Sequence, residues 1–136
     1  MKHYFLILTT VLISQFGFAQ ETTPKTESQT QDAVYNLKSI ESKPEFKGGV
    51  SEFYKFISKN YQTPSDKSFK GGKVFVSFVI EKDGAVTDIN ILRDCGFGSG
   101  DEAKRVLSLC PKWIPGEQDG KKVRVQYTIP ISLPSN

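Results

Sequence analysis

The chain has 136 residues, enough for one domain with a modest hydrophobic core but not for two. Its formal net charge is only +3, and its lysines are scattered along the sequence rather than gathered in one stripe. Composition therefore argues against a nucleic-acid-binding protein, which concentrates basic residues on one face.

The N-terminus has the layout of a secretory signal peptide. A short basic start precedes an apolar run from Tyr4 to Ile13, and a Gly-Phe-Ala sequence ends at Ala19. We expect residues 1–19 to be cleaved before Gln20, which would place the mature chain in the periplasm. The apolar run falls short of the roughly 20 residues that span a membrane. If residues 16–19 extend it, the alternative is a retained anchor in the inner membrane.

Loss of the signal peptide would leave the mature chain without histidine, because His3 is the only one. Ser-His-Asp catalysis, Cys-His catalysis and histidine metal sites are then ruled out, and no carboxylate pair stands out instead. We therefore expect neither an enzyme nor a cofactor. Cys95 precedes the predicted helix at 100–110 and Cys110 lies at its far end, and ten helical residues span ~15 Å. Bridged Cα atoms are rarely more than ~7 Å apart, so no disulfide between them is expected.

Residues 20–43 are expected to form a polar tether. The stretch QETTPKTESQTQ has no hydrophobic periodicity and too little apolar area to offset its chain entropy. Within this tether, Val34 to Ile40 is weakly apolar and is compatible with one short strand. The folded domain is predicted to cover residues 44–134.

Two amphipathic helices are predicted in that domain. The first runs from Val50 to Asn60, and its apolar residues recur at spacings of three and four: Val50, Phe53, Ile57 and Tyr61. The second runs from Gly100 to Cys110, after a capping-box sequence of Ser99 with Glu102, and its expected buried residues are Ala103, Val106, Leu107 and Cys110. The only tryptophan, Trp113, follows between two prolines. We interpret it as packing beneath this exit loop, with a recognition role as the alternative.

A β-hairpin is predicted over residues 73–93, where two apolar runs flank Asp83-Gly84. A two-residue loop fixes the register by counting outward from Lys82 and Ala85. The expected pairs include Ile80 with Thr87, Val79 with Asp88, Ser77 with Asn90, Val76 with Ile91 and Phe75 with Leu92. This register gives one apolar face and one mixed face, as a sheet covered on one side requires.

A last strand is predicted from Val123 to about Leu133, where apolar and polar residues alternate. Pro130 cannot donate to a ladder, which favours an edge position. The directions of the elements then pair this strand with the first hairpin strand. The predicted fold is α+β: a three-stranded antiparallel sheet, order 2-1-3, with two helices packed on one face.

The sequence also resembles a known family. The segments that carry the resemblance are PEFKGG, FVIEKDGAVTDINILRD, EAKRVL, PKWIPG and VRVQYTIPISL, in the same order as in the C-terminal domain of TonB proteins, above all those of Bacteroidetes. The resemblance implies a periplasmic energy-transducer domain without catalytic activity. It would bind the TonB-box peptide of outer-membrane TonB-dependent transporters and support energy-coupled transmembrane import.

The chain departs from the family pattern before this domain. TonB proteins keep an N-terminal anchor and a long proline-rich segment, whereas residues 20–43 hold one proline and reach about 80 Å at ~3.3 Å per residue. Inner-membrane motor proteins are expected partners only if the anchor is retained. The alternative function is a periplasmic interaction or assembly module, a homodimer included, that uses the same sheet edge without energy transduction.

The last strand is the expected binding site, because an edge strand offers unpaired N–H and C=O groups to another extended chain. The candidate partner-binding residues run consecutively along it: Val123, Arg124, Val125, Gln126, Tyr127, Thr128 and Ile129. Arg124 and Gln126 are expected to meet polar groups of the peptide, and Val125 and Tyr127 to pack into the core. The alternative is that Val34 to Ile40 already covers this edge.

Overall fold

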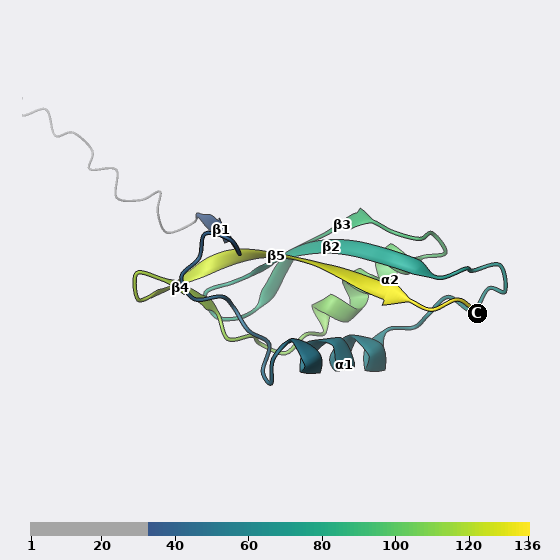
Figure 1. The fold of residues 1–136 in the computed structure, drawn as a ribbon, viewed down its shortest axis with the longest axis horizontal. Coiled ribbons are helices and arrows are strands. Elements are labelled where there is room, and N and C mark those ends of the chain that lie inside the picture. Colours follow the sequence, from purple (N-terminus) through teal and green to yellow (C-terminus); the bar gives the residue numbers. More distant parts are fainter. Residues whose placement is uncertain (1–32) are drawn as a thin grey trace, which may run out of the picture.

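The computed structural model describes residues 33–136; the expected signal peptide and most of the expected tether lie outside them. Figure 1 shows one twisted sheet with both helices on the same side of it. The elements in chain order are β1 (Val34–Asn36), α1 (Val50–Asn60), β2 (Gly72–Ile80), β3 (Val86–Arg93), α2 (Ser99–Ser108), β4 (Gly116–Gln118) and β5 (Lys121–Leu133).

The sheet has five strands rather than the predicted three. Its order is β1-β5-β2-β3, and β4 pairs with the start of β5. The predicted core of this arrangement is confirmed, because β2 lies between β3 and β5 and is antiparallel to both. The sheet is mixed, however, since β1 is parallel to β5. Of the two extra strands, β1 lies in the segment Val34 to Ile40 that is compatible with a short strand, and β4 was not predicted. Each has three residues, too few for an alternating pattern to show in the sequence.

The β4–β5 connection carries a turn signal that the prediction did not use. Asp119 and Gly120 both have positive φ, 52° and 72°, and Gln118 pairs with Lys121 across them. This is the two-residue Asp-Gly hairpin loop that suits the twist of antiparallel strands. The Asp-Gly pair at 119–120 therefore forms the tight hairpin that was predicted at 83–84.

The β2–β3 hairpin has a longer loop than predicted. The N–H of Glu81 donates to Ala85 O at 2.8 Å and that of Gly84 to Glu81 O at 2.8 Å, so the loop has three residues, 82–84. Near the turn the register is consequently shifted, and the predicted pairing of Ile80 with Thr87 is wrong. Ile80 pairs with Val86, and Val79 with Thr87.

A β-bulge then restores the predicted register in the middle of the hairpin. Asp88 has a positive φ of 48°, and two residues of β3 oppose one of β2 at this point. Ser77 with Asn90 and Val76 with Ile91 pair as predicted. A second irregularity pairs Phe75 with Arg93 instead of Leu92. The hairpin was therefore predicted correctly in its strands and only in part in its register.

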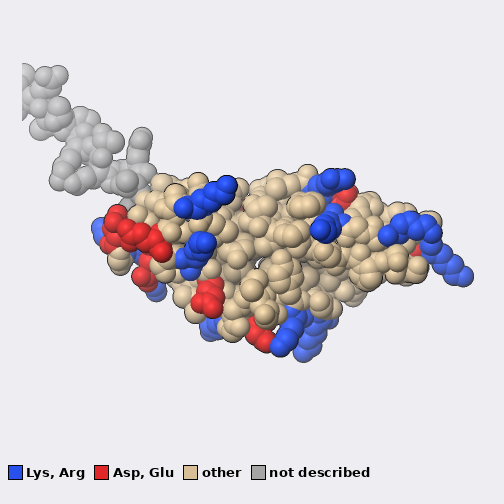
Figure 2. Space-filling model, viewed as in Figure 1, with Lys and Arg blue, Asp and Glu red and all other residues tan. Residues whose placement is uncertain are grey.

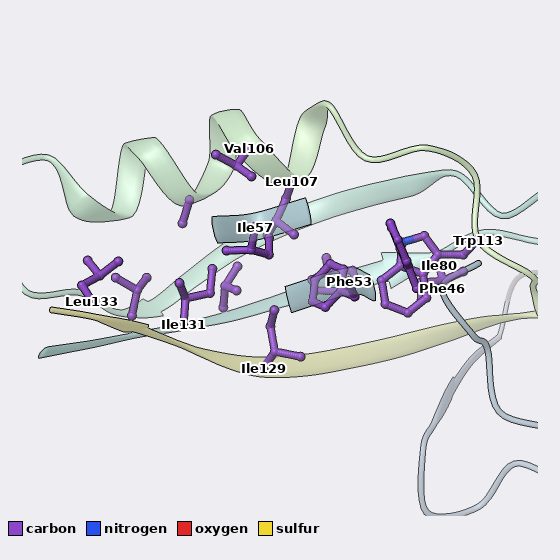
Figure 3. Packing of buried hydrophobic residues seen from close by; sticks show 14 of the residues in the cluster. Phe46, Phe53, Ile57, Ile80, Val106, Leu107, Trp113, Ile129, Ile131 and Leu133 are labelled. Carbon is purple, nitrogen blue, oxygen red and sulfur yellow. The ribbon is translucent and has the colours of Figure 1, made fainter. Parts of the chain in front are cut away.

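The core fills the space between the sheet and the two helices (Figure 3). Its most deeply buried aliphatic and aromatic side chains are Phe53, Phe69, Val74, Val76, Phe78, Ile80, Val106, Leu107 and Val125.

Two predicted details of the helices are wrong. Val50 is 58 % exposed and lies at the rim of α1. Ser99 does not cap α2; it is the first helical residue, buried, and its Oγ accepts the N–H of Cys95 at 3.0 Å.

Trp113 lies at the centre of an aromatic cluster, with 4 % of its surface exposed. Its ring contacts Phe46, Phe53, Phe78 and Tyr127 at centroid distances of 5.4, 5.0, 5.9 and 5.3 Å. Such edge and tilted contacts add to the energy of burial. The predicted packing role is confirmed, and burial leaves no surface for the alternative of a recognition role.

The backbone around Trp113 is fixed against the β2–β3 turn. The N–H of Trp113 donates to Gly84 O at 2.9 Å, and a Cβ on Gly84 would overlap the carbonyl oxygen of Trp113. Gly84 also has a φ of +85°. A glycine is therefore required here both by conformation and by close approach of two chain segments.

We predict that Gly84→Ala lowers the free energy of unfolding by about 3 kcal/mol or more, because a left-handed residue and a backbone overlap both have to be accommodated. Gly120→Ala is the matched control, since Gly120 also has positive φ but would place its Cβ in open space. It should cost about 1 kcal/mol. Urea unfolding of both variants measures the difference, and equal losses would contradict the close approach.

Candidate partner-strand interface

The orientation of β5 is set by its pairing with β2. Nine consecutive pairs, from Gly72 with Leu133 to Ile80 with Val125, join the two strands without a bulge. Along β5 the odd-numbered side chains are turned toward the helices: Val125, Ile129, Ile131 and Leu133 are buried, and Tyr127 is half-buried. The even-numbered side chains are on the other face of the sheet.

The backbone of β5 alternates in the same regular way. Pro130 has no N–H, and its carbonyl accepts a hydrogen bond from the hydroxyl of Tyr54 on α1 at 3.4 Å. The polar backbone groups of this residue therefore face away from β2. With a period of two, those of Arg124, Gln126, Thr128 and Ser132 face outward as well.

The structure covers part of the predicted binding edge. Val123 pairs with Gly116 of β4, and Arg124, Val125 and Gln126 pair with β1. The alternative, in which Val34 to Ile40 covers the edge, is thus correct for Arg124, Val125 and Gln126, whereas Val123 is paired by β4. Tyr127, Thr128 and Ile129 have no strand partner on this side within residues 33–136. The open edge accordingly begins four residues later than predicted.

The sequence suggested that Arg124 meets polar groups of an incoming peptide, but in the structure its side chain is paired with Glu81. Its guanidinium forms a two-bond pair with Glu81, Nε to Oε2 at 2.8 Å and Nη2 to Oε1 at 3.0 Å, and a longer contact with Asp88 at 3.4 Å. The hydrogen bond from Arg124 lowers the pKa of the Glu81 carboxyl, against a smaller opposing effect of burial. Arg124 thereby links β5 to β2 and β3 on the face opposite the helices.

Two hollows flank the outer side of β5. One, of about 220 Å³, lies between α1 and the C-terminal part of β5; its lining has no charged side chain and comprises Ile57, Ser58, Tyr61, Thr63, Ile131, Ser132, Leu133 and Pro134. The other, of about 370 Å³, adjoins the end of β1 and is lined by Asn36, Leu37, Lys38, Gln126 and Thr128. In Figure 2 the surface between β5 and α1 is mostly uncharged, with lysines and acidic residues around it.

Tyr61 forms one wall of the hollow between α1 and β5, called the uncharged hollow below, and is held in place by α2. Its hydroxyl donates to Ser99 O at 2.6 Å, and burial, with a further effect of the Glu102 charge, raises the pKa of Tyr61 to about 12. The hydroxyl is therefore a fixed donor at neutral pH. Sequence reasoning assigned Tyr61 and Ile57 only to the core; the hollow depends on the crossing of α1 over β5, which no local pattern specifies.

Tyr127 of the predicted site packs into the core, as expected. Its ring stacks on Phe78 at 5.7 Å with an interplanar angle of 25°. Burial, and to a smaller extent the nearby Tyr54, raises the pKa of Tyr127. Of the seven predicted residues, Thr128 is therefore the one that combines an exposed side chain with an open backbone on the outer side.

The other end of the sheet is less suited to an added strand. β3 is exposed along much of its length, with Leu92 60 % exposed. Its pairing with β2 is interrupted by irregularities on both sides of Val76–Ser77. Bulges of this kind twist an edge and disrupt the regular row of donors and acceptors that a second chain would need.

Other kinds of site find no support in the part of the chain that the structure describes. No group of three or more histidine, cysteine or acidic residues in residues 33–136 is placed to hold a metal ion. No helix in this range is both long and apolar enough to cross a membrane. Cys95 and Cys110 are both free thiols, and burial raises the pKa of Cys110 to about 11, with a smaller opposing effect from Trp113.

We predict that Glu81→Gln destabilises the protein by about 1 kcal/mol at pH 7, because a half-buried two-bond pair with Arg124 is lost. The folded-state pKa of Glu81 is lowered, so its contribution is present above the unfolded pKa of about 4.3 and disappears as the pH falls below that value. The difference between wild type and variant should therefore shrink from pH 5 to pH 3. Urea unfolding at several pH values tests this. Glu52→Gln, which removes an exposed pair with Lys55, should change little at any pH.

Comparison with known proteins gives one family. The model of the Gram-negative bacterial TonB protein C-terminal matches residues 59–132, which is more than half of the chain. The match begins at the end of α1 and extends almost to the end of β5, so it includes the open edge and half of the residues that line the hollow between α1 and β5. No curated protein matches the chain.

Proposed function

Because the chain belongs to the Gram-negative TonB C-terminal family, we propose that it binds the TonB-box peptide of outer-membrane transporters by adding the peptide as a strand to β5. The family is an envelope-associated, transport-related domain without catalytic activity. It acts in energy transduction, in interaction with outer-membrane transporters.

The observation that carries the proposal is the regular, partly open outer side of β5. An added strand gains affinity from backbone hydrogen bonds and specificity from alternate side chains. From Thr128 onward the outward backbone groups have no strand partner in residues 33–136. On its other side β5 is paired with β2 without a bulge, which keeps the spacing of these groups regular. β3, with its bulges, offers no comparable row.

The uncharged hollow between α1 and β5 supplies the side-chain recognition. A strand that lies beside Ile131 places every second side chain toward α1. The walls there include Ile57, Tyr61 and Leu133 together with the hydroxyl-bearing Ser58, Thr63 and Ser132, and they carry no charged group. We therefore propose that the peptide inserts an uncharged, apolar side chain between α1 and β5. A charged side chain at this position would lose its hydration without gaining a partner.

The short tether supports a second candidate, the interaction or assembly module without energy transduction. Residues 20–43 contain only one proline and reach about 80 Å when extended at ~3.3 Å per residue. Deletion of the gene separates the two functions, because only the first requires loss of uptake of transporter substrates. Mass spectrometry of the mature N-terminus tests the proposed cleavage before Gln20: recovery of intact Met1 in the membrane fraction would favour a retained anchor and coupling to the motor.

We predict an alternating effect of single backbone N-methyl groups moved along a TonB-box peptide. In a strand ladder only every second amide of the added chain points to the protein, so methylation should weaken binding about tenfold at alternate positions and leave the positions between them unchanged. Isothermal titration calorimetry measures each peptide. Uniform tolerance of methylation would contradict strand addition.

A matched pair of protein variants tests the position on β5. Thr128→Pro removes the outward N–H, in the way that Pro130 already lacks one, whereas Thr128→Ala changes only an exposed side chain. Peptide affinity should fall about tenfold in the proline variant and stay near wild type in the alanine variant. Thermal unfolding of both variants serves as the control for folding. Equal affinities would place the peptide elsewhere.

A further inference from the structure

β1 is the part of the sheet with the weakest attachment. It has three residues, pairs only with β5, and lies on the side that the proposed partner would use. Val34 is 45 % exposed, Asn36 is exposed, and only Tyr35 is half-buried. Because so little side-chain surface is buried, backbone hydrogen bonds to β5 are the main interactions that hold β1 in place.

The chain after β1 is fastened much more firmly. Ser42 and Glu117 exchange two backbone hydrogen bonds, at 3.1 and 2.9 Å, and Ile40 is buried at 8 % exposure. Gln118 Oε1 accepts the N–H of Glu41 at 3.0 Å. Between this anchor and β1 lies an exposed turn, where Asn36 Oδ1 accepts the N–H groups of Lys38 and Ser39 at 2.9 and 3.1 Å. β1 is thus attached at its C-terminal side to a fixed point a few residues away.

The open part of the β5 edge offers few donors. Thr128 and Ser132 have outward N–H groups, but Pro130 between them has none, and its carbonyl is already bonded to Tyr54. The next outward donors belong to Arg124 and Gln126, and these face β1. A partner strand that pairs with β5 over more than Thr128 to Ser132 therefore has to take the place of β1.

We propose that β1 is a built-in competitor, which occupies part of the partner-strand site in the free protein and is displaced when a partner strand binds. This inference rests on the proposed function and concerns its regulation. β1 lies beside β5 as an added peptide strand would, and its anchor at Ser42 holds it near the site after displacement. Release of the partner would let β1 return and close the edge, which protects an otherwise exposed edge from unwanted pairing.

Competition of this kind weakens the binding of the partner. The apparent dissociation constant equals the intrinsic one divided by the fraction of molecules in which β1 is detached. If β1 is paired in about nine of ten molecules, a variant with β1 detached binds the partner about tenfold more tightly. Tyr35 faces Val125, whose backbone is turned to β2, so in a parallel ladder the N–H of Tyr35 points at β5 and that of Val34 points away. This difference supplies a matched pair of variants.

The experiment uses the full chain with Tyr35→Pro and Val34→Pro. Hydrogen exchange first tests whether β1 detaches by itself, by comparing the amides of Gln126, which faces β1, and Ile129, which faces β2. In wild type and Val34→Pro, the Gln126 amide should be protected but exchange at least a hundredfold faster than Ile129. In Tyr35→Pro its protection should disappear, with Ile129 unchanged. Equal exchange rates of the two amides in wild type would overturn the inference, because β1 would then open only with the whole domain.

Titration with a synthetic TonB-box peptide then tests the competition. We expect about tenfold tighter binding to Tyr35→Pro than to wild type or Val34→Pro, and accelerated tryptic cleavage after Lys38 when the peptide binds wild type. Equal affinity for all three proteins, with the Gln126 amide protected in wild type and unprotected in Tyr35→Pro, would overturn the inference and leave the proposed function standing. Absence of binding to all three would refute the proposed function, and the exchange of Gln126 would then decide separately whether β1 opens.

Discussion

The rest of the structure depends on the antiparallel pairing of β2 with β5. Its nine pairs run without a bulge, so side chains and backbone groups of β5 alternate regularly over the whole length. This regularity places Val125, Ile129 and Ile131 in the core and turns the backbone of Thr128 outward. The same strand therefore belongs to the core on one face, and from Thr128 onward its outer side has no strand partner in residues 33–136.

The aromatic cluster around Trp113 packs against the helix-facing side of the β2–β5 pair. Trp113 fills the space between α1 and the sheet, and its backbone is bonded to the β2–β3 turn at Gly84. Tyr127 of β5 stacks on Phe78 at the margin of this cluster. The start of the open edge is thus supported by rigid packing, as a preorganised binding surface requires.

The sequence predicts much of this fold because the long elements carry strong signals. The helices follow from apolar spacing, and the central position of β2 follows from strand direction and from its continuous apolar character. β4 was not predicted, since three residues carry no usable period. β1 was anticipated only as a short strand somewhere in Val34 to Ile40, because its pairing partner β5 is far away in the sequence. The hairpin register failed near Asp83-Gly84 because an Asp-Gly pair fits both a two-residue loop and a three-residue loop with a bulge. In the structure the three-residue loop is formed, and its Gly84 contacts the backbone of Trp113, a tertiary contact that local sequence does not show.

The site was predictable in part for the same reason. Pro130 correctly indicated an edge, because a proline in a paired position would lose a ladder bond. Coverage of the edge by Val34 to Ile40 was left as an alternative, and its extent, Arg124 to Gln126, was not predicted. Nor did the sequence show that Arg124 is bound by Glu81, 43 residues away. Nor did it reveal the hollow between α1 and β5, whose walls come together only through tertiary packing.

The central claim is that a transporter peptide lies along the outer side of β5. Intermolecular nuclear Overhauser effects between an unlabelled TonB-box peptide and the isotope-labelled protein test it most directly. The account predicts cross-strand contacts from the peptide backbone to the amide of Thr128, and contacts from one apolar peptide side chain to Ile57 and Leu133. Contacts confined to β3 or α2, with the Thr128 amide unchanged, would contradict it.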